Sequence, residues 1–304
     1  MGDTLMTLPE IDRQFATEDK CRELLERLRW PNGPECPRCS TREVIRLSTN
    51  RNLLWCTKCE YQFGVTVGTV WHDSHLPLKT WFMAVLLLCE ARKGMSANQI
   101  KRVLGISYKT AWYLCHRIRA AMVESQQTKL NGIVEMDETY FGGRKKGVTM
   151  SEAKAAKQIV LGIRQRNGEL RLFQAKDVTS KTLRDFIEKN IAEDVELFVT
   201  DEFIPYNYAV RGKHKTAHRQ IRHKETYVRG EIHTNTVENA FSLFKRGVMG
   251  TWHKISAKHL SAYLREMSFR FNRRNAKEIF LDTLHHMINS PALPFERLTA
   301  THQS

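Results

Sequence analysis

The sequence has no long hydrophobic segment. Although 41% of its 304 residues are hydrophobic, the longest uninterrupted apolar run, Trp81 to Cys89, covers nine residues. A helix needs roughly 20 apolar residues to cross a bilayer, so we expect no membrane span. The N-terminus carries Asp3, Glu10 and Asp12 and has no apolar stretch after a basic start, so it does not resemble a secretory signal. We therefore expect a cytoplasmic protein.

Internal repeats and low-complexity tracts are also absent, and acidic residues are scarce in one long segment. From Phe203 to Asn275 there are fifteen Lys or Arg but only four Glu, within a chain of net charge +15. Six histidines lie in the same segment. Such a surplus suits a polyanionic partner, because each neutralised phosphate releases condensed counterions. On charge alone, a basic surface without a partner remains the alternative.

Four of the seven cysteines form two closely spaced pairs. Cys36-Pro-Arg-Cys39 and Cys56-Thr-Lys-Cys59 are separated by sixteen residues, a spacing typical of a tetrahedral structural zinc site. The spacer is long enough for a β-hairpin that brings the pairs together. A redox dithiol or a rubredoxin-like iron site remains the alternative. The other thiols lie on apolar helical faces and are expected to be buried as small hydrophobic groups: Cys21, Cys89 and Cys115.

The region 76–122 has a helical pattern throughout. Within it, Ser96 and Ser107 can each cap a short helix, and Gly105 lies in the turn between the two. This pattern predicts a helix-turn-helix, whose second helix could enter a DNA major groove. An ordinary helical hairpin remains the alternative. On or near the exposed side of the second helix we expect Tyr108, Lys109, Tyr113, His116, Arg117 and Arg119.

Beyond Gly132 the pattern changes to strands mixed with helices. Four strands are predicted, the second and third joined by an Asn167-Gly168 corner, with a helix at 180–192 before the last: 133–140, 158–165, 169–176 and 196–201. This order places the first and last strands side by side in a mixed sheet. Asp137 and Asp201, one on each of these strands, can then converge.

A third acid is expected from a helix that begins near Thr236. Glu238 and Lys245 lie seven residues apart and share one face of this helix. Carboxylate oxygens bind Mg²⁺ while leaving positions open for water and substrate, and two such ions can promote in-line attack at phosphorus. Glu138 and Glu202 each adjoin one of the aspartates and are expected to point away, because neighbouring strand residues face opposite sides.

At these residues the sequence resembles the insertion-sequence DDE transposases with an N-terminal zinc ribbon, the ISXO2-like family. The resemblance extends from about Thr17 to Asn275. Its motifs are Trp55 to Cys59, Gly68 to His72, Leu76 to Leu78, Met136 to Gly143, Thr200 to Glu202, His233 to Gly247 and Gly250 to His253.

The resemblance implies a ribonuclease-H-like catalytic domain that binds terminal inverted repeats, cleaves DNA with Mg²⁺ or Mn²⁺, and transfers a 3′-hydroxyl into target DNA. By position, Asp137, Asp201 and Glu238 are the three acids and Lys245 is the basic residue after them. Some members replace the third acid, so three neighbouring polar residues keep a claim to that role: His233, Asn235 and Asn239. An inactive DNA-binding regulator and a ribonuclease-H-like repair nuclease remain the alternative functions.

The expected architecture is therefore an α/β protein. Its predicted parts are an N-terminal helix (1–29), a zinc ribbon (30–75), a helix-turn-helix domain (76–128), a catalytic domain with a mixed sheet (129–280) and a C-terminal tail (281–304). Two element ends must be brought together, so the resemblance implies a homodimer or larger homo-oligomer on nucleoid DNA. The residues expected to contact double-stranded DNA are Tyr108, Lys109, Arg117, Arg119, Arg211, Lys213, Arg219, Arg222, Lys245 and Arg246.

Overall fold

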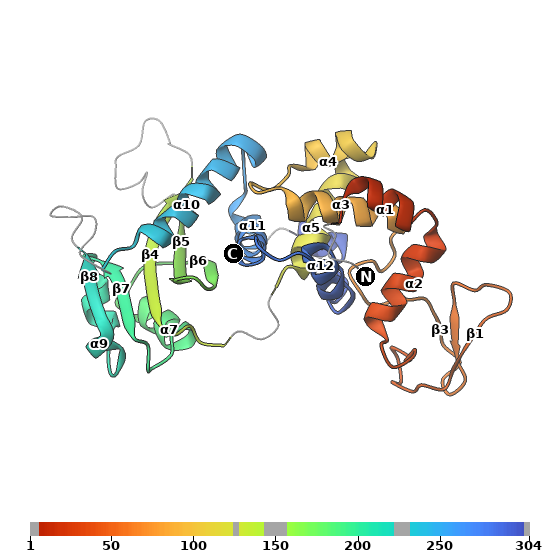
Figure 1. Cartoon of the computed structure of the whole chain (residues 1–304), viewed down its shortest axis with the longest axis horizontal. Coiled ribbons are helices and arrows are strands. Elements are labelled where there is room, and N and C mark those ends of the chain that lie inside the picture. The colour runs from red at the N-terminus through yellow and green to blue at the C-terminus, as the bar shows by residue number, and fades with distance from the viewer. Residues whose placement is uncertain (1–5, 124–127, 143–156, 222–231, 301–304) are drawn as a thin grey trace. The chain divides into compact units, whose positions relative to one another are not determined.

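The computed structural model describes residues 6–123, 128–142, 157–221 and 232–300 (Figure 1). The chain divides into two compact units, of which unit 1 comprises Met1–Val123 and Arg273–Ser304, and unit 2 comprises Glu124–Asn272. Each unit is considered by itself below. Among the residues described, no helix combines the length and the hydrophobicity that crossing a bilayer requires.

Unit 1 is a helical body that carries a small sheet. Its apolar centre lies around Phe82, whose ring contacts Phe15 at 5.1 Å and Phe280 at 5.8 Å between centroids. The sequence therefore brings three distant segments to one core. The helices are α1 (Leu8–Gln14), α2 (Glu18–Arg29), α3 (Leu78–Glu90), α4 (Ala97–Leu104), α5 (Tyr108–Ala121), α12 (Ile279–Ile288) and α13 (Phe295–Thr299).

The C-terminal segment differs from the expected tail. Helix α12 packs against α2, α3 and α5, and its buried side chains include Phe280 and Leu284. The segment 281–304, predicted as a C-terminal tail, thus contributes most of α12 to the core of unit 1. Residues 273–280, which were expected to close the catalytic domain, belong to the same unit.

The small sheet of unit 1 has the order β1-β2-β3. Strands β1 (Val44–Arg46), β2 (Leu54–Cys56) and β3 (Gln62–Phe63) pair antiparallel, with Val44 opposite Cys56 and Leu54 opposite Phe63. The predicted hairpin in the cysteine spacer is therefore present. Leu54 and Phe63 are buried together with Cys36 and Cys56 in a core of very few residues.

Helices α4 and α5 form the predicted pair joined by a tight turn. The side chains of Ser96 and Ser107 accept hydrogen bonds from the amides of Gln99 and Thr110, so each serine caps its helix. Gly105 ends α4 with φ at 66°, a left-handed conformation that glycine adopts without strain. The local sequence alone thus determines both helix starts and the turn.

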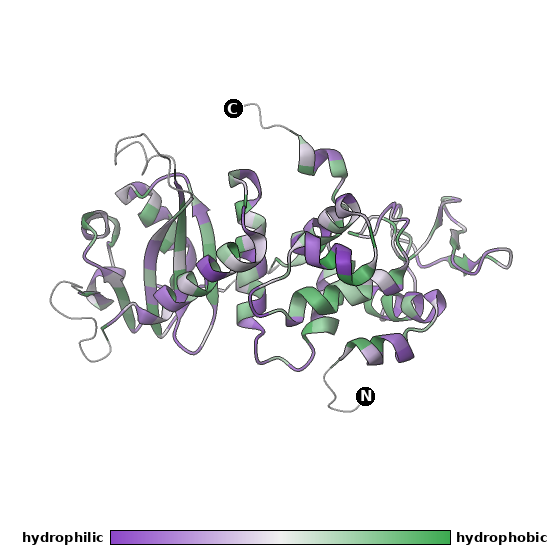
Figure 2. Cartoon of the chain, turned by 90° about the horizontal axis from the view of Figure 1, so that it is seen from above, coloured by the Kyte–Doolittle hydropathy of each residue, from purple (hydrophilic) through white to green (hydrophobic). Residues whose placement is uncertain are grey.

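Unit 2 is built on one five-stranded mixed sheet of order β6-β5-β4-β7-β8. The pairs β4–β5 and β5–β6 are antiparallel, whereas β4–β7 and β7–β8 are parallel. The neighbouring positions of β4 and β7 agree with the predicted strand order, whereas β8 was not among the predicted strands. Bands of hydrophobic and hydrophilic residues alternate along these strands (Figure 2). The strands are β4 (Ile133–Phe141), β5 (Gln158–Gln165), β6 (Leu170–Ala175), β7 (Leu197–Asp201) and β8 (His218–Ile221).

Helices cover both faces of this sheet. On one face, α7 (Ser180–Asn190) and α8 (Ile204–Ala209) bury Leu183 and Tyr206 against Met136 of β4. On the other face, α10 (Asn235–Gly247) packs on β4 and β5, the π-helix η1 (Val248–Trp252) follows it, and α11 (Ala257–Asn272) packs on β6. A short helix, α9 (His214–Ala217), precedes β8. The sheet is therefore the middle layer of three.

A glycine on β5 allows α10 to approach the sheet closely. Gly162 lies opposite Asp137, and a Cβ atom at this position would come within 2.5 Å of Cζ of Phe241 on α10. We expect Gly162→Ala to lower the free energy of unfolding of unit 2 by about 1–3 kcal/mol, because the helix must shift or the ring must leave its rotamer. Chemical denaturation followed by circular dichroism measures this change.

Gly250→Ala is the matched control for Gly162→Ala. Nothing lies within 4 Å of a Cβ atom built at Gly250, so this substitution should leave stability unchanged or slightly raised. Equal stability of the two variants would show that α10 does not rest on Gly162.

Candidate functional sites

The four cysteines of the two CxxC pairs converge at one end of the small sheet. Their Sγ atoms all lie within 4.8 Å of one another, with Cys36 3.7 Å from Cys59 and Cys39 3.5 Å from Cys56. Four thiolates at about 2.3 Å from a central zinc ion would be separated by roughly 3.8 Å along each edge of the tetrahedron. The cluster therefore fits a tetrahedral metal site with all four positions supplied by the protein.

The two cysteine pairs have the same backbone geometry. The amides of Ser40 and Glu60 donate to the carbonyls of Cys36 and Cys56, four residues earlier, and both Ser40 and Glu60 have positive φ, at 55° and 57°. The amides of Cys36 and Cys56 in turn donate to the carbonyls five residues later. Each pair thus forms a closed knuckle that directs two sulfurs to the same point.

Asp137 and Asp201 meet at the centre of the large sheet. In the parallel pairing of β4 with β7, Glu135 lies beside Val199, and the same register continued by two residues sets Asp137 beside Asp201. Asp137 lies opposite Gly162, beneath α10, and alternate residues of a strand share a face. Both aspartates consequently point to the face that α10 covers.

Glu138 joins this cluster, contrary to expectation, although it does lie on the opposite face of β4 from Asp137. Single carboxylate oxygens of Asp137, Glu138 and Asp201 all lie within 4.8 Å of one another. On that face the buried hydroxyl of Tyr206 donates to Oε2 of Glu138 at 2.9 Å. Glu202, adjacent to Asp201, is exposed, and it is not among the described carboxylates that lie within 4.8 Å of one another.

Crowding of carboxylates changes the acidity of the cluster. Burial raises the pKa of Asp137 to about 8, and the negative charges of Glu138, Asp201 and Glu238 contribute to the increase. Burial and the same cluster also raise the pKa of Tyr206 well above its usual value, so this residue stays a hydroxyl donor. Without a cation, the cluster therefore retains a proton at neutral pH, and its hard oxygen donors suit Mg²⁺ or Mn²⁺.

Glu238 lies beside the cluster, in the first turn of α10. Its side chain is half-buried, and its Oε1 accepts a hydrogen bond of 2.7 Å from Oγ1 of Thr234. Its charge acts on Asp137, as the raised pKa shows. Among the residues that the structure describes, however, the group of carboxylates within 4.8 Å of one another contains Glu138 rather than Glu238.

The other polar residues considered on α10 take different positions. Lys245 and Arg246 lie in the last turn and are exposed, as are Asn235 and Asn239. His233, before the helix, lies with its Nδ1 atom 3.3 Å from Oε1 of Glu135 on β4. Of the α10 residues considered, Glu238 therefore lies next to the cluster and is oriented by its hydrogen bond from Thr234.

On α5, only the start of the helix matches the expected exposed surface. Tyr108 and Lys109 are exposed, but Arg117 and Arg119 are 4% and 1% exposed, and His116 is buried as well. The expectation that these arginines face DNA is therefore wrong. The physical reason is that α3 and α12 pack against α5, so that its second half is enclosed by residues from both ends of the chain.

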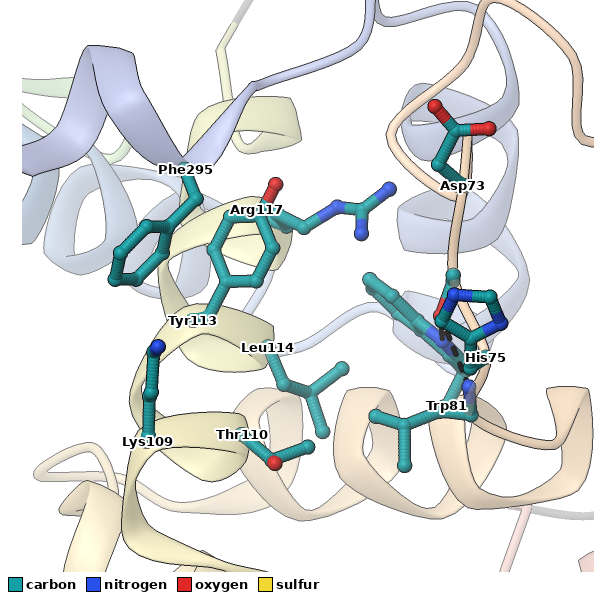
Figure 3. Close-up of a pocket in the computed structure, with 11 residues that line it drawn as sticks. Asp73, His75, Trp81, Lys109, Thr110, Tyr113, Leu114, Arg117 and Phe295 are labelled. Carbon is teal, nitrogen blue, oxygen red and sulfur yellow. Dashed lines mark hydrogen bonds between the residues drawn. The ribbon is translucent and has the colours of Figure 1, made fainter.

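Arg117 lines a pocket of about 510 Å³ between α3, α5 and α13 (Figure 3). Its guanidinium lies 5.0 Å from the ring centroid of Tyr113 and 5.1 Å from that of Trp81, and its Nη2 donates to the carbonyl of His72. Lys109 lies 4.9 Å from the Phe295 ring at the other side. Arg117 is thus held by its own neighbours and joins α5 to the chain before α3.

The basic segment after β7 is only partly described. Arg211, Lys213 and Arg219 are exposed, and Nζ of Lys213 pairs with Glu193 at 3.0 Å. Arg222 lies outside the described residues. The described part of this segment therefore presents cations next to the sheet edge formed by β8.

The two regions that contain these clusters each match a known protein family. Residues 129–272, which contain the large sheet and α10, match the model of the ISXO2-like transposase domain. Residues 16–62, which contain the four clustered cysteines, match the model of a transposase zinc-ribbon domain. The chain thus carries the two domains matched by this family, the ISXO2-like transposase domain and the transposase zinc ribbon. The fold expected for the family, a mixed sheet flanked by helices together with a zinc ribbon, is thereby confirmed.

A relative of this chain is found in Halobacterium salinarum. It is named an uncharacterized protein in transposable element ISH50, and it is 27% identical over 275 residues, which cover 85% of this chain and 92% of the relative. The aligned stretch is therefore long enough to contain both the zinc ribbon and the carboxylate cluster.

Three residues near the carboxylates were not identified from the sequence of this chain. Glu138 was expected on the opposite face of β4, where it lies, but alternation along a strand does not consider how far a glutamate side chain reaches. Thr234 directly precedes a predicted helix, which is a signal for a cap but not for a contact with Glu238. Tyr206 carries no local signal, because its role depends on α8 packing beneath β4.

Proposed function

We propose that this protein is an active transposase that binds the inverted-repeat ends of its element, cleaves a phosphodiester at each end and joins the freed 3′-hydroxyl to target DNA. The convergence of Asp137 and Asp201 on neighbouring parallel strands, with Glu238 delivered by the helix above them, carries this proposal. Acids gathered in this way destabilise one another unless cations neutralise them. A site that accumulates such repulsion is suited to divalent metal ions.

Asp137, Asp201 and Glu238 would hold Mg²⁺ or Mn²⁺. When bound, the ions would supply positive charge to the scissile phosphate and activate the attacking hydroxyl group. The protein's own residues set the geometry: the strand register fixes the two aspartates, Thr234 orients Glu238, and Tyr206 holds Glu138 at the edge of the cluster. Glu138 adds a fourth negative charge and is a further oxygen donor for the same ions.

DNA binding is assigned to residues that the structure exposes. Tyr108 and Lys109 would contact DNA from the start of α5, and a larger basic set would contact the backbone: Arg211, Lys213, Arg219, Lys245 and Arg246. The cysteine cluster would bind Zn²⁺ and stabilise the ribbon. Because two element ends must meet, the protein would act as a dimer or a larger assembly.

End cleavage in vitro tests this proposal. The wild-type protein is incubated with a labelled duplex of the inverted repeat taken from the DNA that flanks the gene, in Mg²⁺ or in EDTA. We expect metal-dependent nicking at the element end, and its loss in Asp201→Ala, because no other group replaces the ligand at the end of β7. Asp185→Ala, which removes an exposed aspartate of α7, is the matched control and should cleave normally.

The same assay separates the alternatives. Tight end binding without cleavage by the wild-type protein would indicate a DNA-binding regulator, and cleavage that ignores the end sequence would indicate a nuclease. Lys245→Ala should reduce end cleavage about tenfold, as one charge-assisted contact to DNA would, and should leave the melting temperature unchanged because Lys245 is exposed. An unchanged cleavage rate would remove Lys245 from the site.

A further inference from the structure

The start of α10 is capped in an unusual way. The residue before the helix, Thr234, makes no side-chain hydrogen bond to the first helical amides, although threonine commonly does so. Elsewhere in this chain, Thr7, Thr17 and Thr179 each accept such a bond from the third helical amide. The first amides of α10 must therefore find another acceptor.

That acceptor is Glu135 on β4, one hundred residues earlier in the chain. Its Oε2 accepts hydrogen bonds from the amides of Thr236 and Val237 at 3.0 and 3.2 Å, and from Oγ1 of Thr236 at 2.7 Å. A carboxylate at this position also interacts favourably with the positive end of the helix dipole. The sheet, rather than the loop before the helix, thus caps α10.

Glu135 is completely buried, and its charge is balanced locally. Nε of Arg166, at the end of β5, donates to its Oε1 at 2.6 Å, and His233 lies 3.3 Å from the same atom. Arg166 also donates to the carbonyl of His233 at 3.2 Å. An isolated buried carboxylate would be costly, so this set of partners compensates for the burial of Glu135 beneath the helix.

Two consequences follow for Glu238. Because Glu135 takes over the capping of α10, the hydroxyl of Thr234 is available to donate to Oε1 of Glu238 at 2.7 Å. Glu135 and Asp137 also lie two residues apart on the same face of β4. One strand therefore carries the first aspartate and the anchor of the helix that carries the third acid.

We propose that Glu135 is a positioning residue, which fixes the start of α10 and thereby sets Glu238 at the correct distance from Asp137 for both to bind the same metal ions. This inference rests on the proposed function, because it assigns Glu238 to the metal site. Glu135 itself does not contact the metal ions or the DNA. Its effect passes through the helix amides and through Thr234.

Metal binding by the full chain, measured without DNA, tests the positioning role. Titration with Mn²⁺ followed by electron paramagnetic resonance gives the affinity of the carboxylate site, for which Asp201→Asn defines the background. We expect Glu135→Gln to weaken Mn²⁺ binding roughly tenfold or more, as loss of an outer-shell partner does. Glu169→Gln, which breaks the 2.7 Å pair with the buried Arg171 elsewhere on the sheet, is the matched control and should bind normally.

Hydrogen exchange of the same variants measures the capping of α10 by Glu135 independently of any metal. The amides of Thr236 and Val237 should exchange about tenfold faster in Glu135→Gln than in Glu169→Gln, because they lose their carboxylate acceptor. Thr234→Val should weaken Mn²⁺ binding without changing exchange at these amides, since it removes only the contact to Glu238. It also provides the test of positioning if Glu135→Gln does not fold.

The two proposals fail in different ways. A wild-type protein that binds no Mn²⁺ above the Asp201→Asn background contradicts the proposed metal site. The exchange rates then test only whether Glu135 caps α10. A folded Glu135→Gln protein with wild-type Mn²⁺ affinity contradicts the positioning role, whatever the exchange rates. Wild-type Mn²⁺ affinity in Thr234→Val contradicts the transmission through Thr234.

Discussion

Asp137→Asn should stabilise the metal-free protein at pH 8, although it removes a residue of the proposed active site. Asp137 has its pKa raised from 3.8 to about 8 in the folded chain by burial and by neighbouring carboxylates. The folded state therefore binds a proton that the unfolded state has released. The stability that this proton contributes is fully present below about pH 3.8 and is lost as the pH rises to about 8.

Asparagine does not ionise, so the variant does not lose stability as the pH rises. We expect the melting temperature of Asp137→Asn to exceed that of the wild type in EDTA, with a difference that grows from pH 5 to pH 8 and corresponds to on the order of a few kcal/mol. Saturating Mg²⁺ should reverse the order, because a bound cation stabilises only the intact carboxylate cluster. Thermal unfolding followed by circular dichroism measures both effects.

Asp177→Asn is the control with the opposite sign. Hydrogen bonds from Thr182 and Thr179 lower the pKa of Asp177, so its charged form contributes stability at neutral pH. This variant should be equally or less stable than the wild type in EDTA at pH 8. If Asp137→Asn is also less stable there, burial and repulsion within the cluster do not destabilise the ionised form of Asp137.

Removing the metal from the cysteine cluster should unfold the ribbon. The strands of its sheet have three, three and two residues, and only a few side chains are buried beneath them. So small a core does not hold a fold, and structural zinc contributes on the order of 10 kcal/mol in comparable peptides. We expect Cys56→Ser, or a strong chelator, to release about one Zn²⁺ per chain and to open residues 36–63 to proteolysis.

Cys115→Ala is the matched control for the ribbon. It removes a buried thiol of α5 that lies outside the cysteine cluster, so zinc content and ribbon cleavage should stay unchanged. A Cys56→Ser protein that keeps its full zinc content and resists proteolysis between residues 36 and 63 would show that the metal does not hold this sheet.

The parts of the fold that depend on local sequence could be predicted. The two CxxC pairs, the serine caps of α4 and α5 and the Asn167-Gly168 hairpin each carry their signal within a few residues. The pairing of Asp137 with Asp201 followed from strand order, because two more strands and a helix between them leave β4 and β7 side by side. Whether these acids bind metal remains a prediction.

The parts that depend on distant packing could not be predicted. Arg117 and Arg119 have an exposed helical spacing when α5 is considered alone, and they are buried because α12 arrives from the other end of the chain. In the sequence, Glu135 is one of several acids on a predicted strand, and its role as a cap depends on α10 packing above it. Sequence patterns indicate which elements form, whereas these roles depend on which elements meet.

Unit 1 is assembled from both ends of the polypeptide, with all of unit 2 inserted between them. During synthesis the ring of Phe82 is made early, but Phe280, which packs against it, leaves the ribosome almost two hundred residues later. The helices of unit 1 can therefore complete their core only after the large sheet of unit 2 has been translated. A prematurely terminated product would therefore lack the helix that completes the core of unit 1.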